Sequence, residues 1–431
     1  MALDAFKKSW IQLYNEKQNG KFQGATKPAT FYDKWNFVGA YDDLFAFLGY
    51  EITQDVPKVY TIQGKLNFCD KTLNLTREAA EVNGATGVNA RYGLGQNIFG
   101  NSYTAAINLD NGIEFDNAGL VEKTVYLYRT GSFQDWGANN STVSTDTPNA
   151  GSYIAIPAMV STTVWGNQIP SMQGFLLKFT DAATEFNPIG ASVTLKYNNG
   201  GVVANSKPQL AQKAPLSHLT VTLNSKTTVD RVWLFSQEGT TDQFDNGWDG
   251  RKYFGTPTAF LYSESSFGPL QVNTSSDLNG KLLTIYPNKD SEYTLTLKKE
   301  NLADYTDLHL VDLVARKVTP LTGETTTYNF TEKNSGSRVK RFMIVNSANI
   351  DFNIDQFKLL DGYLQGNDRL IVTNMTTKTG RAYLYDMAGK TVMSQVMQPS
   401  INEFPVTLKS GAYILNLDAD GKQESVKLIV K

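Results

Sequence analysis

The chain has 431 residues, a formal net charge of −2 and 19% charged residues. This length exceeds what one ordinary hydrophobic core supports, so we expect about two to four domains. The balanced charge argues against a nucleic-acid partner, which requires a broad basic surface. The single cysteine, Cys69, excludes an intramolecular disulfide and a thiolate metal cluster, and we expect it to be a small buried side chain.

No stretch of the chain approaches the roughly 20 consecutive apolar residues that a membrane-spanning helix requires. The first eight residues, Met-Ala-Leu-Asp-Ala-Phe-Lys-Lys, lack the apolar core and the small-residue cleavage site of a signal peptide. We therefore expect this sequence to be a fragment or a mature form whose natural start lies upstream.

Near the start of the chain, apolar residues recur at helical spacing with Lys and Glu between them: Leu3, Phe6, Trp10, Ile11 and Tyr14. This i, i+3, i+4, i+7 pattern predicts one short amphipathic helix over residues 3–17.

Beyond residue 50 the pattern changes to short alternating runs separated by Gly, Asn and Asp. The clearest runs are residues 58–62, 124–128, 174–179, 219–223, 231–235 and 281–285. Strands at this spacing, with few helical windows between them, are typical of sandwiches and not of βαβ units. The sequence therefore predicts an all-β protein built from consecutive β-sandwich domains of the jelly-roll or immunoglobulin-like kind.

Two polar segments divide the chain. Residues 199–215 contain Asn, Gly, Lys, Gln and Pro without a sustained apolar period, and residues 346–349 follow directly on a strand-like run. The predicted domains are therefore an N-terminal β-rich domain over residues 1–200, truncated at its start, a second sandwich over 216–347 and a C-terminal sandwich over 350–431.

The C-terminal segment carries the most informative motifs. The run Leu-Tyr-Asp-Met-Ala-Gly-Lys at 384–390 breaks a strand at Gly389, and Leu-Lys-Ser-Gly-Ala-Tyr-Ile-Leu-Asn-Leu follows at 408–417. The chain then ends in Lys-Leu-Ile-Val-Lys at 427–431. A Gly between two β-rich runs is a strong hairpin signal, because Gly accepts the positive φ of a tight turn.

In their order these motifs resemble the type A C-terminal sorting domain of type IX secretion cargo. The resemblance implies export across the outer membrane by a secretion translocon, followed by attachment at the cell surface. It implies recognition through seven residues: Asp386, Gly389, Lys390, Gly411, Tyr413, Lys427 and Lys431. An ordinary immunoglobulin-like sandwich is the alternative, because sandwich topology alone does not separate the two.

The upstream part carries a second, weaker resemblance. Residues 95–107 resemble a segment of surface proteins that bear this sorting domain, with Ser102 in place of their usual Pro, and residues 244–252 resemble their Asp-rich segment. Because the upstream regions of such proteins are generally surface or adhesin-like modules, the resemblance implies location more than activity.

An acidic loop at 242–250 offers several oxygen atoms on a backbone bent by two glycines. Asp242, Asp245, Asn246 and Asp249 suit a hard cation such as Ca²⁺, although the spacing is not that of an EF-hand. The alternative is a structural loop whose carboxylates cap backbone amides, with Lys252 or Arg251 neutralising one of them.

Trp136 and Trp165 lie in loops bounded by Gly and Asn in the same predicted domain. An indole ring at the rim of a sandwich offers a flat apolar surface to a sugar, with polar neighbours for its hydroxyls. The alternative is that each ring closes the end of a sandwich core.

The sequence contains few residues or motifs that indicate an enzyme. Only His218 and His309 titrate ordinarily near neutral pH, and no Ser elbow, His-Glu-x-x-His or Cys-x-x-Cys motif occurs. We therefore expect a non-enzymatic, secreted, surface-attached protein whose upstream sandwiches act in adhesion or carbohydrate binding. Two alternatives stay open: the C-terminal fragment of a larger secreted glycosidase or protease, and a structural stalk or surface-layer component.

Overall fold

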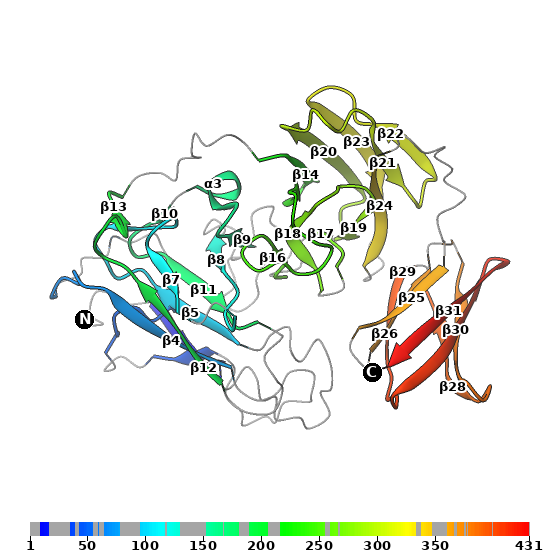
Figure 1. Ribbon diagram of the computed structural model, residues 1–431, viewed down its shortest axis with the longest axis horizontal. Coiled ribbons are helices and arrows are strands. Elements are labelled where there is room, and N and C mark those ends of the chain that lie inside the picture. Colours follow the sequence, from blue (N-terminus) through cyan, green and yellow to red (C-terminus); the bar gives the residue numbers. More distant parts are fainter. Residues whose placement is uncertain are drawn as a thin grey trace. The chain divides into compact units, whose positions relative to one another are not determined.

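The computed structural model describes residues 9–16, 35–38, 43–54, 59, 64–77, 95–116, 119–129, 152–166, 168–180, 189–205, 216–254, 259–265, 268–332, 338–346, 360–365, 369–374, 376, 378–398 and 400–430. These residues form β-strands almost throughout, joined by turns, with a short helix α3 (Ser161–Val164) (Figure 1). The predicted all-β fold is confirmed. Within the described ranges no helix has the length and apolar character needed to cross a membrane.

Contacts divide the chain into two compact units. Unit 1 comprises residues 1–142, 151–214 and 246–250, and unit 2 comprises residues 143–150, 215–245 and 251–431. The short segment 246–250 thus belongs to unit 1, although its neighbours on both sides in the sequence belong to unit 2. The boundaries that we predict at 200–216 and 347–350 stay predictions.

The described residues of unit 1 form four small sheets. Their strands, in spatial order, are β2 (Trp35–Phe37), β1 (Ser9–Tyr14) and β3 (Tyr50–Gln54); β10 (Gln168–Ile169), β6 (Ala106–Asn108) and β13 (Val202–Val203); β5 (Gln96–Gly100), β11 (Gly174–Lys178), β8 (Thr124–Arg129) and β9 (Ser152–Pro157); and β4 (Lys71–Arg77), β12 (Ile189–Leu195) and β7 (Ile113–Phe115). The strands predicted at 124–128 and 174–179 correspond to β8 and β11, whereas the run at 58–62 lies almost wholly outside the described residues.

The helix predicted over residues 3–17 is wrong where the structure describes it. Residues 9–14 form β1, which pairs antiparallel with β3 from Ser9 to Leu13 and with β2 from Gln12 to Tyr14. Pairing on both sides satisfies the backbone hydrogen bonds of this segment. These contacts with distant strands outweigh the helical spacing of its apolar residues, because fifteen residues are too few to define that spacing well. Residues 3–8 lie outside the described part.

A buried asparagine organises the loop after β5. The Asn101 amide nitrogen donates to the carbonyl oxygens of Ala105, Ile169 and Pro170 at 3.0–3.1 Å, and its oxygen accepts from the Tyr103 amide. Ser102, where the resembling proteins have Pro, accepts a hydrogen bond from the Phe47 amide (2.8 Å). These bonds hold an irregular backbone in place of a regular ladder.

Cys69 is exposed, so the expectation of a buried side chain is wrong. Its carbonyl oxygen accepts a 2.8 Å hydrogen bond from the hydroxyl of the buried Tyr103. The loop is therefore fixed through its backbone, and the position requires no buried side chain.

Unit 2 begins with one large sheet, whose path runs through β22 (Lys317–Pro320), β21 (Leu308–Asp312), β24 (Val339–Asn346), β19 (Lys281–Tyr286), β17 (Phe260–Ser263), β18 (Leu270–Ser275), β15 (Val229–Ser236), β14 (His218–Asn224), β20 (Glu292–Glu300) and β23 (Thr325–Thr331), with β16 (Gly250–Arg251) paired to β18. The strands predicted at 219–223, 231–235 and 281–285 are β14, β15 and β19.

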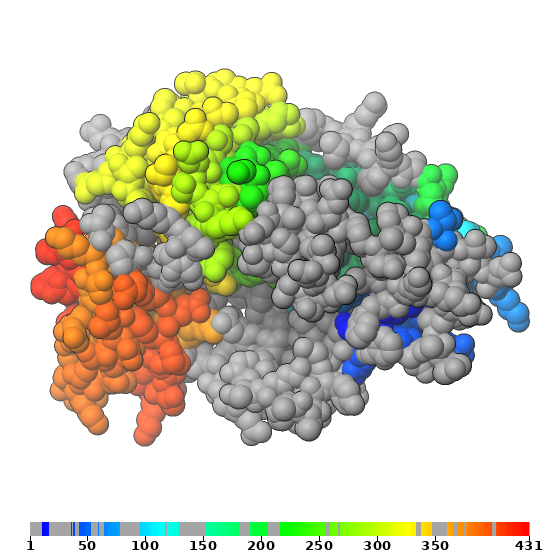
Figure 2. Space-filling model, turned by 180° about the vertical axis from the view of Figure 1, so that it is seen from behind, coloured from blue at the N-terminus to red at the C-terminus, as the bar shows by residue number. Residues whose placement is uncertain are grey.

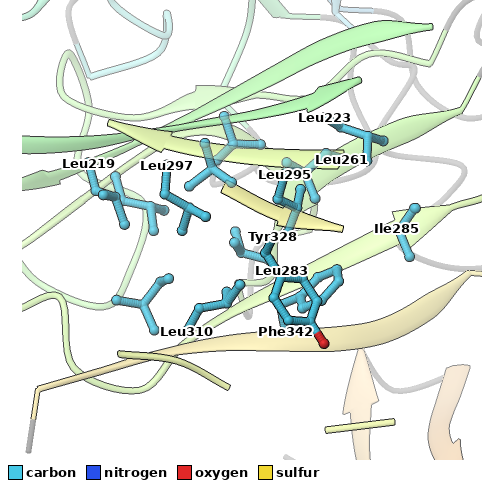
Figure 3. Close-up of a cluster of buried hydrophobic side chains, with 14 of the residues drawn as sticks. Leu219, Leu223, Leu261, Leu283, Ile285, Leu295, Leu297, Leu310, Tyr328 and Phe342 are labelled. Atoms are coloured by element: carbon cyan, nitrogen blue, oxygen red, sulfur yellow. The ribbon is translucent and has the colours of Figure 1, made fainter. Parts of the chain in front are cut away.

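The sheet curls around its own core. Figure 3 shows buried side chains from strands at both ends of the path, such as Leu310 of β21 and Tyr328 of β23, pointing into one cluster with Leu219, Leu283 and Leu295. At about 25 cal/mol per Å² of apolar area removed from water, this shared core is the main source of the stability of the sheet.

A hydrogen-bond network around a buried ion pair connects the two ends of the same path. Asp312 at the end of β21 accepts two bonds from Arg341 Nε (3.1 and 3.2 Å) and one from its Nη2 (2.8 Å). The Tyr328 hydroxyl of β23 donates to the same carboxylate (3.0 Å), while Arg341 Nη1 donates to the Thr331 carbonyl and the Glu332 carboxylate. The network therefore connects β21 and β24 to β23.

The rest of unit 2 is a C-terminal sandwich of two antiparallel sheets, drawn from orange to red in Figures 1 and 2. One sheet contains β25 (Leu360–Gln365), β26 (Arg369–Asn374) and β29 (Ser400–Pro405), and the other contains β28 (Thr391–Met397), β27 (Gly380–Asp386), β30 (Gly411–Ala419) and β31 (Lys422–Val430). Leu360, Leu370 and Val372 of the first sheet share one core with Leu384, Leu415 and Leu428 of the second.

Replacing Asp312 by Asn should lower the free energy of unfolding of unit 2 by about 3 kcal/mol, because it removes the buried negative charge that Arg341 Nε and Nη2 contact and leaves the guanidinium with the partly exposed Glu332. Urea unfolding followed by fluorescence of the buried Trp233 measures this loss. The control is Lys298→Ala, which breaks the exposed pair of Lys298 with Glu300 and should cost no more than about 1 kcal/mol. Equal effects of the two substitutions would contradict the role of the network.

Candidate functional site

The turn between β27 and β28 is built by one carboxylate. Asp386 Oδ1 accepts hydrogen bonds from the amides of Ala388 and Lys390, both at 2.9 Å, and the Gly389 amide donates to the Asp386 carbonyl. Gly389 has a φ of +79°, which a side chain would strain. The hairpin predicted from Gly389 is confirmed, and the Asp and Gly of the motif each have a definite structural role.

A tyrosine fixes the loop before β30. The Tyr413 hydroxyl accepts a hydrogen bond from the Lys409 amide (3.1 Å) and donates one to the Lys409 carbonyl (2.9 Å). Its ring is buried in the core of the sandwich. Gly411 opens β30, and in the ladder Tyr413 lies opposite Asp386 of β27.

The structure therefore brings most of the predicted sorting residues to one end of the sheet. Asp386, Gly411 and Tyr413 lie on neighbouring strands there, with Gly389 and Lys390 in the adjoining turn. Lys427 is exposed on β31, opposite Ile414 of β30. The seventh predicted residue, Lys431, lies outside the described residues. Sequence reasoning missed Lys409, because its contribution is made by backbone atoms.

The oxygen atoms of the acidic loop are engaged with the protein. Asp242 forms an ion pair with Lys281, and Asp245 Oδ2 accepts from the amide and the hydroxyl of Thr241. Lys281 thus neutralises Asp242, whereas Lys252 pairs with Asp230. These contacts fit the expected structural loop better than a set of converging ligands.

Asn246 and Asp249 belong to unit 1. The Asn246 side chain accepts from the Lys123 amide (2.6 Å) and donates to the Val121 carbonyl (3.0 Å), while the carbonyl of the buried Asp249 accepts from the Thr124 hydroxyl (2.8 Å). Among the described residues no group of three or more His, Cys, Asp or Glu is arranged to hold a metal ion. The calcium site stays a prediction.

Of the two predicted ligand-binding tryptophans, the structure describes Trp165, and Trp136 lies outside the described residues. Trp165 ends helix α3, its ring is half-buried, and its indole N–H donates to the Gln168 carbonyl (3.2 Å). The ring is neither a free platform nor a fully enclosed core residue, so a role in ligand binding stays a prediction.

Both histidines lie in strands. His309 is in β21, as its apolar neighbours predict, and its Nδ1 bonds to the Asp307 carbonyl (3.0 Å). His218 opens β14, with its Nδ1 bonded to the Leu216 carbonyl (2.7 Å) and its ring stacked on Phe235 at 4.9 Å. Burial lowers the pKa of His218 against the opposing effects of the Leu216 carbonyl and Glu300.

Sequence reasoning also missed a shallow groove on the C-terminal sandwich, lined among others by Arg381, Tyr383 and Asp418. The spacing of Arg381 and Tyr383 places them on one face of a strand. Their neighbour Asp418 comes from β30, 37 positions after Arg381, and only the register between the strands brings it beside them.

The chain was compared with family models, with curated proteins and with solved structures. No family model matches the chain. The minor fimbrium subunit Mfa5 of Porphyromonas gingivalis is 32% identical to it over 420 residues, or 92% of this chain. The chain spans 32% of the length of that curated relative. Among solved structures, dimeric latent PorU of Porphyromonas gingivalis is similar over 73% of this chain and 30% of its own, at 11% identity and a TM-score of 0.18, which is below the level of a shared fold.

If Asp242, Asp245, Asn246 and Asp249 bind Ca²⁺, a chelator should lower the melting temperature, and excess Ca²⁺ should restore it by mass action. The contacts to Lys281, Thr241 and the Lys123 amide lead us to expect no change instead. Differential scanning calorimetry with chelator and with added Ca²⁺ decides between them. An Asp245→Asn variant is the control, because a reversible shift in the parent that this variant lacks would establish the metal site.

The stability of unit 2 should fall as the pH is lowered below about 6.5. A depressed pKa means that unfolded His218, with its ordinary value of 6.5, binds a proton before the folded form does. The contribution is complete above 6.5 and is lost as the pH falls from there toward the lower folded value. Urea unfolding at a series of pH values should show this slope, and His218→Gln should flatten it. An unchanged slope in the variant would contradict the assignment.

Proposed function

We propose that this chain is a non-enzymatic protein of the bacterial cell surface, of the fimbrium-subunit type. The observation that carries the proposal is the 32% identity with a minor fimbrium subunit over 92% of this chain. Because the chain spans 32% of that subunit, the proposal concerns location and a surface role, and it does not transfer the activity of the whole relative.

We further propose that the C-terminal sandwich is a type IX sorting domain, read by the secretion translocon and by the attachment machinery of the outer membrane. The order of its three motifs supports this role. Support also comes from the geometry of Asp386, Gly389 and Tyr413, which shape one end of the sheet, and from Lys427, which is exposed on β31. An exposed lysine on a paired strand suits recognition by another protein.

The remaining sandwiches would act in adhesion or carbohydrate binding, with Trp165 and Trp136 as the proposed contacts. The environment of His218 supports a role in recognition over one in catalysis. His218 is buried, stacked and kept neutral by a lowered pKa, so it serves the core. A general base requires instead a group within reach of a substrate proton.

Export through the C-terminal sandwich is tested in a bacterium that has type IX secretion, with the chain placed after a cleavable signal peptide. Removing residues 350–431 should leave the protein in the periplasm, and removing only Lys427–Lys431 should have nearly the same effect. Cell fractionation and digestion of intact cells with protease measure display at the surface.

Point substitutions separate lost recognition from lost folding. Lys390→Ala and Lys427→Ala change exposed side chains and should reduce display while leaving the melting temperature unchanged. Lys422→Ala, also exposed and on the same sheet, is the matched control and should be displayed normally. Normal display of the protein that lacks residues 350–431 would refute the sorting role.

A further inference from the structure

The outer face of the second C-terminal sheet carries a row of side chains set by strand register. Arg381 of β27 lies between Val396 of β28 and Asp418 of β30. One step along β27 on the same face, Tyr383 lies between Ser394 and Asn416. Alternation sends Ala382 and Leu384 into the core, so this face is free to carry polar and aromatic groups.

A groove of about 410 Å³ lies over this row. Its lining includes Thr379, Arg381, Tyr383, Val396 and Asp418. This volume suits one or two sugar rings and is at the small end of ligand sites in proteins, which occupy roughly 300–1,000 Å³.

The groove contains an arginine, Arg381, that has no hydrogen-bonded or ionic partner among the described residues. Arg381 and Asp418 are direct cross-strand neighbours, yet no ion pair joins them. Asp418 Oδ2 accepts a 3.0 Å hydrogen bond from Gln423 instead, and Arg381 makes no hydrogen bond or ion pair within the described part of the chain. Five guanidinium N–H donors and a carboxylate oxygen are therefore available to a ligand at adjacent positions.

The floor of the groove is partly apolar. Tyr383 is half-buried and stacks on Tyr385, with ring centroids 6.3 Å apart and planes 22° apart. Val396 beside it is 45% exposed. An aromatic ring held by a neighbouring ring is a rigid platform that loses little entropy when a flat apolar surface stacks on it.

The local charge is balanced. Lys378 and Asp420 at the end of the groove form an ion pair (2.6 Å), and the charges of Arg381 and Asp418 cancel. An ionic ligand would leave one charge without a partner, whereas a neutral ligand with paired hydroxyls uses both groups. One hydroxyl donates to the carboxylate, and its neighbour accepts from the guanidinium.

We propose that this groove binds a neutral pyranose saccharide, with the C–H face of the sugar on Tyr383 and two vicinal hydroxyls between Arg381 and Asp418. A peptide is less suitable, because the groove lies on the face of β27, whose backbone is paired on both sides with β28 and β30 and offers no edge for strand addition. This inference goes beyond the proposed function, which places glycan contacts at Trp165 and Trp136 of unit 1.

Ligand-observed NMR with the full chain tests the inference. The probes are the methyl pyranosides of glucose, galactose and mannose, together with glucuronate, all at millimolar concentration. We expect saturation transfer to at least one neutral glycoside. Arg381→Ala and Tyr383→Ala should each weaken its binding about tenfold, the effect of losing one charged hydrogen bond or one ring contact. Tyr383→Phe should retain binding, because it keeps the ring.

Lys298→Ala is the control, because it removes an exposed cation of unit 2 that does not line the groove and should not change binding. Circular dichroism and the melting temperature establish that each variant is folded, and Asp418→Asn provides a groove variant of unchanged size. The inference is overturned if no neutral glycoside binds, if only glucuronate binds, or if Trp165→Ala abolishes binding while the groove variants do not. That last outcome would instead support the unit 1 site of the proposed function.

Discussion

The large sheet of unit 2 depends on the buried pair between Asp312 and Arg341. A curled sheet has two end strands whose unpaired backbone groups invite pairing with other chains. Here the pair, together with the Tyr328 hydroxyl and the Thr331 carbonyl, connects β21 and β24 at one end of the path to β23 at the other. Hydrophobic contact holds the two layers together without fixing their register, and a bidentate ion pair has the directional geometry to do so.

In the C-terminal sandwich, the core and the turns fix the arrangement of the strands separately. Its core takes every second residue of each strand, and its turns are fixed by single side chains, Asp386 for one hairpin and Tyr413 for the loop before β30. Because the core and these turns fix the backbone, the side chains of the outer face are not needed to hold the fold together. Arg381 can therefore remain without a hydrogen-bonded or ionic partner among the described residues.

Much of this architecture was predictable from the sequence, and the failures have identifiable physical causes. Alternation located β8, β11, β14, β15 and β19, and Gly389 located a hairpin, because these signals lie within one or two strands. The helix at 3–17 failed because β3 pairs with residues 9–13, a contact that a local period does not contain. Likewise, the pairing of Asp242 with Lys281 joins a loop residue to a strand residue 39 positions away, which no local pattern contains.

Buried and exposed charged side chains of this chain differ in their partners. Two ion pairs lie in the interior: Lys178 lies 3.9 Å from Glu122, and Lys252 contacts Asp230. A charge held in this way is expensive to remove and poorly placed to exchange protons with a substrate. At the surface, Arg381 lies beside Tyr383 and has no hydrogen bond or ion pair within the described part of the chain. Arg381 is exposed to solvent instead, which is what the saccharide site that we propose requires.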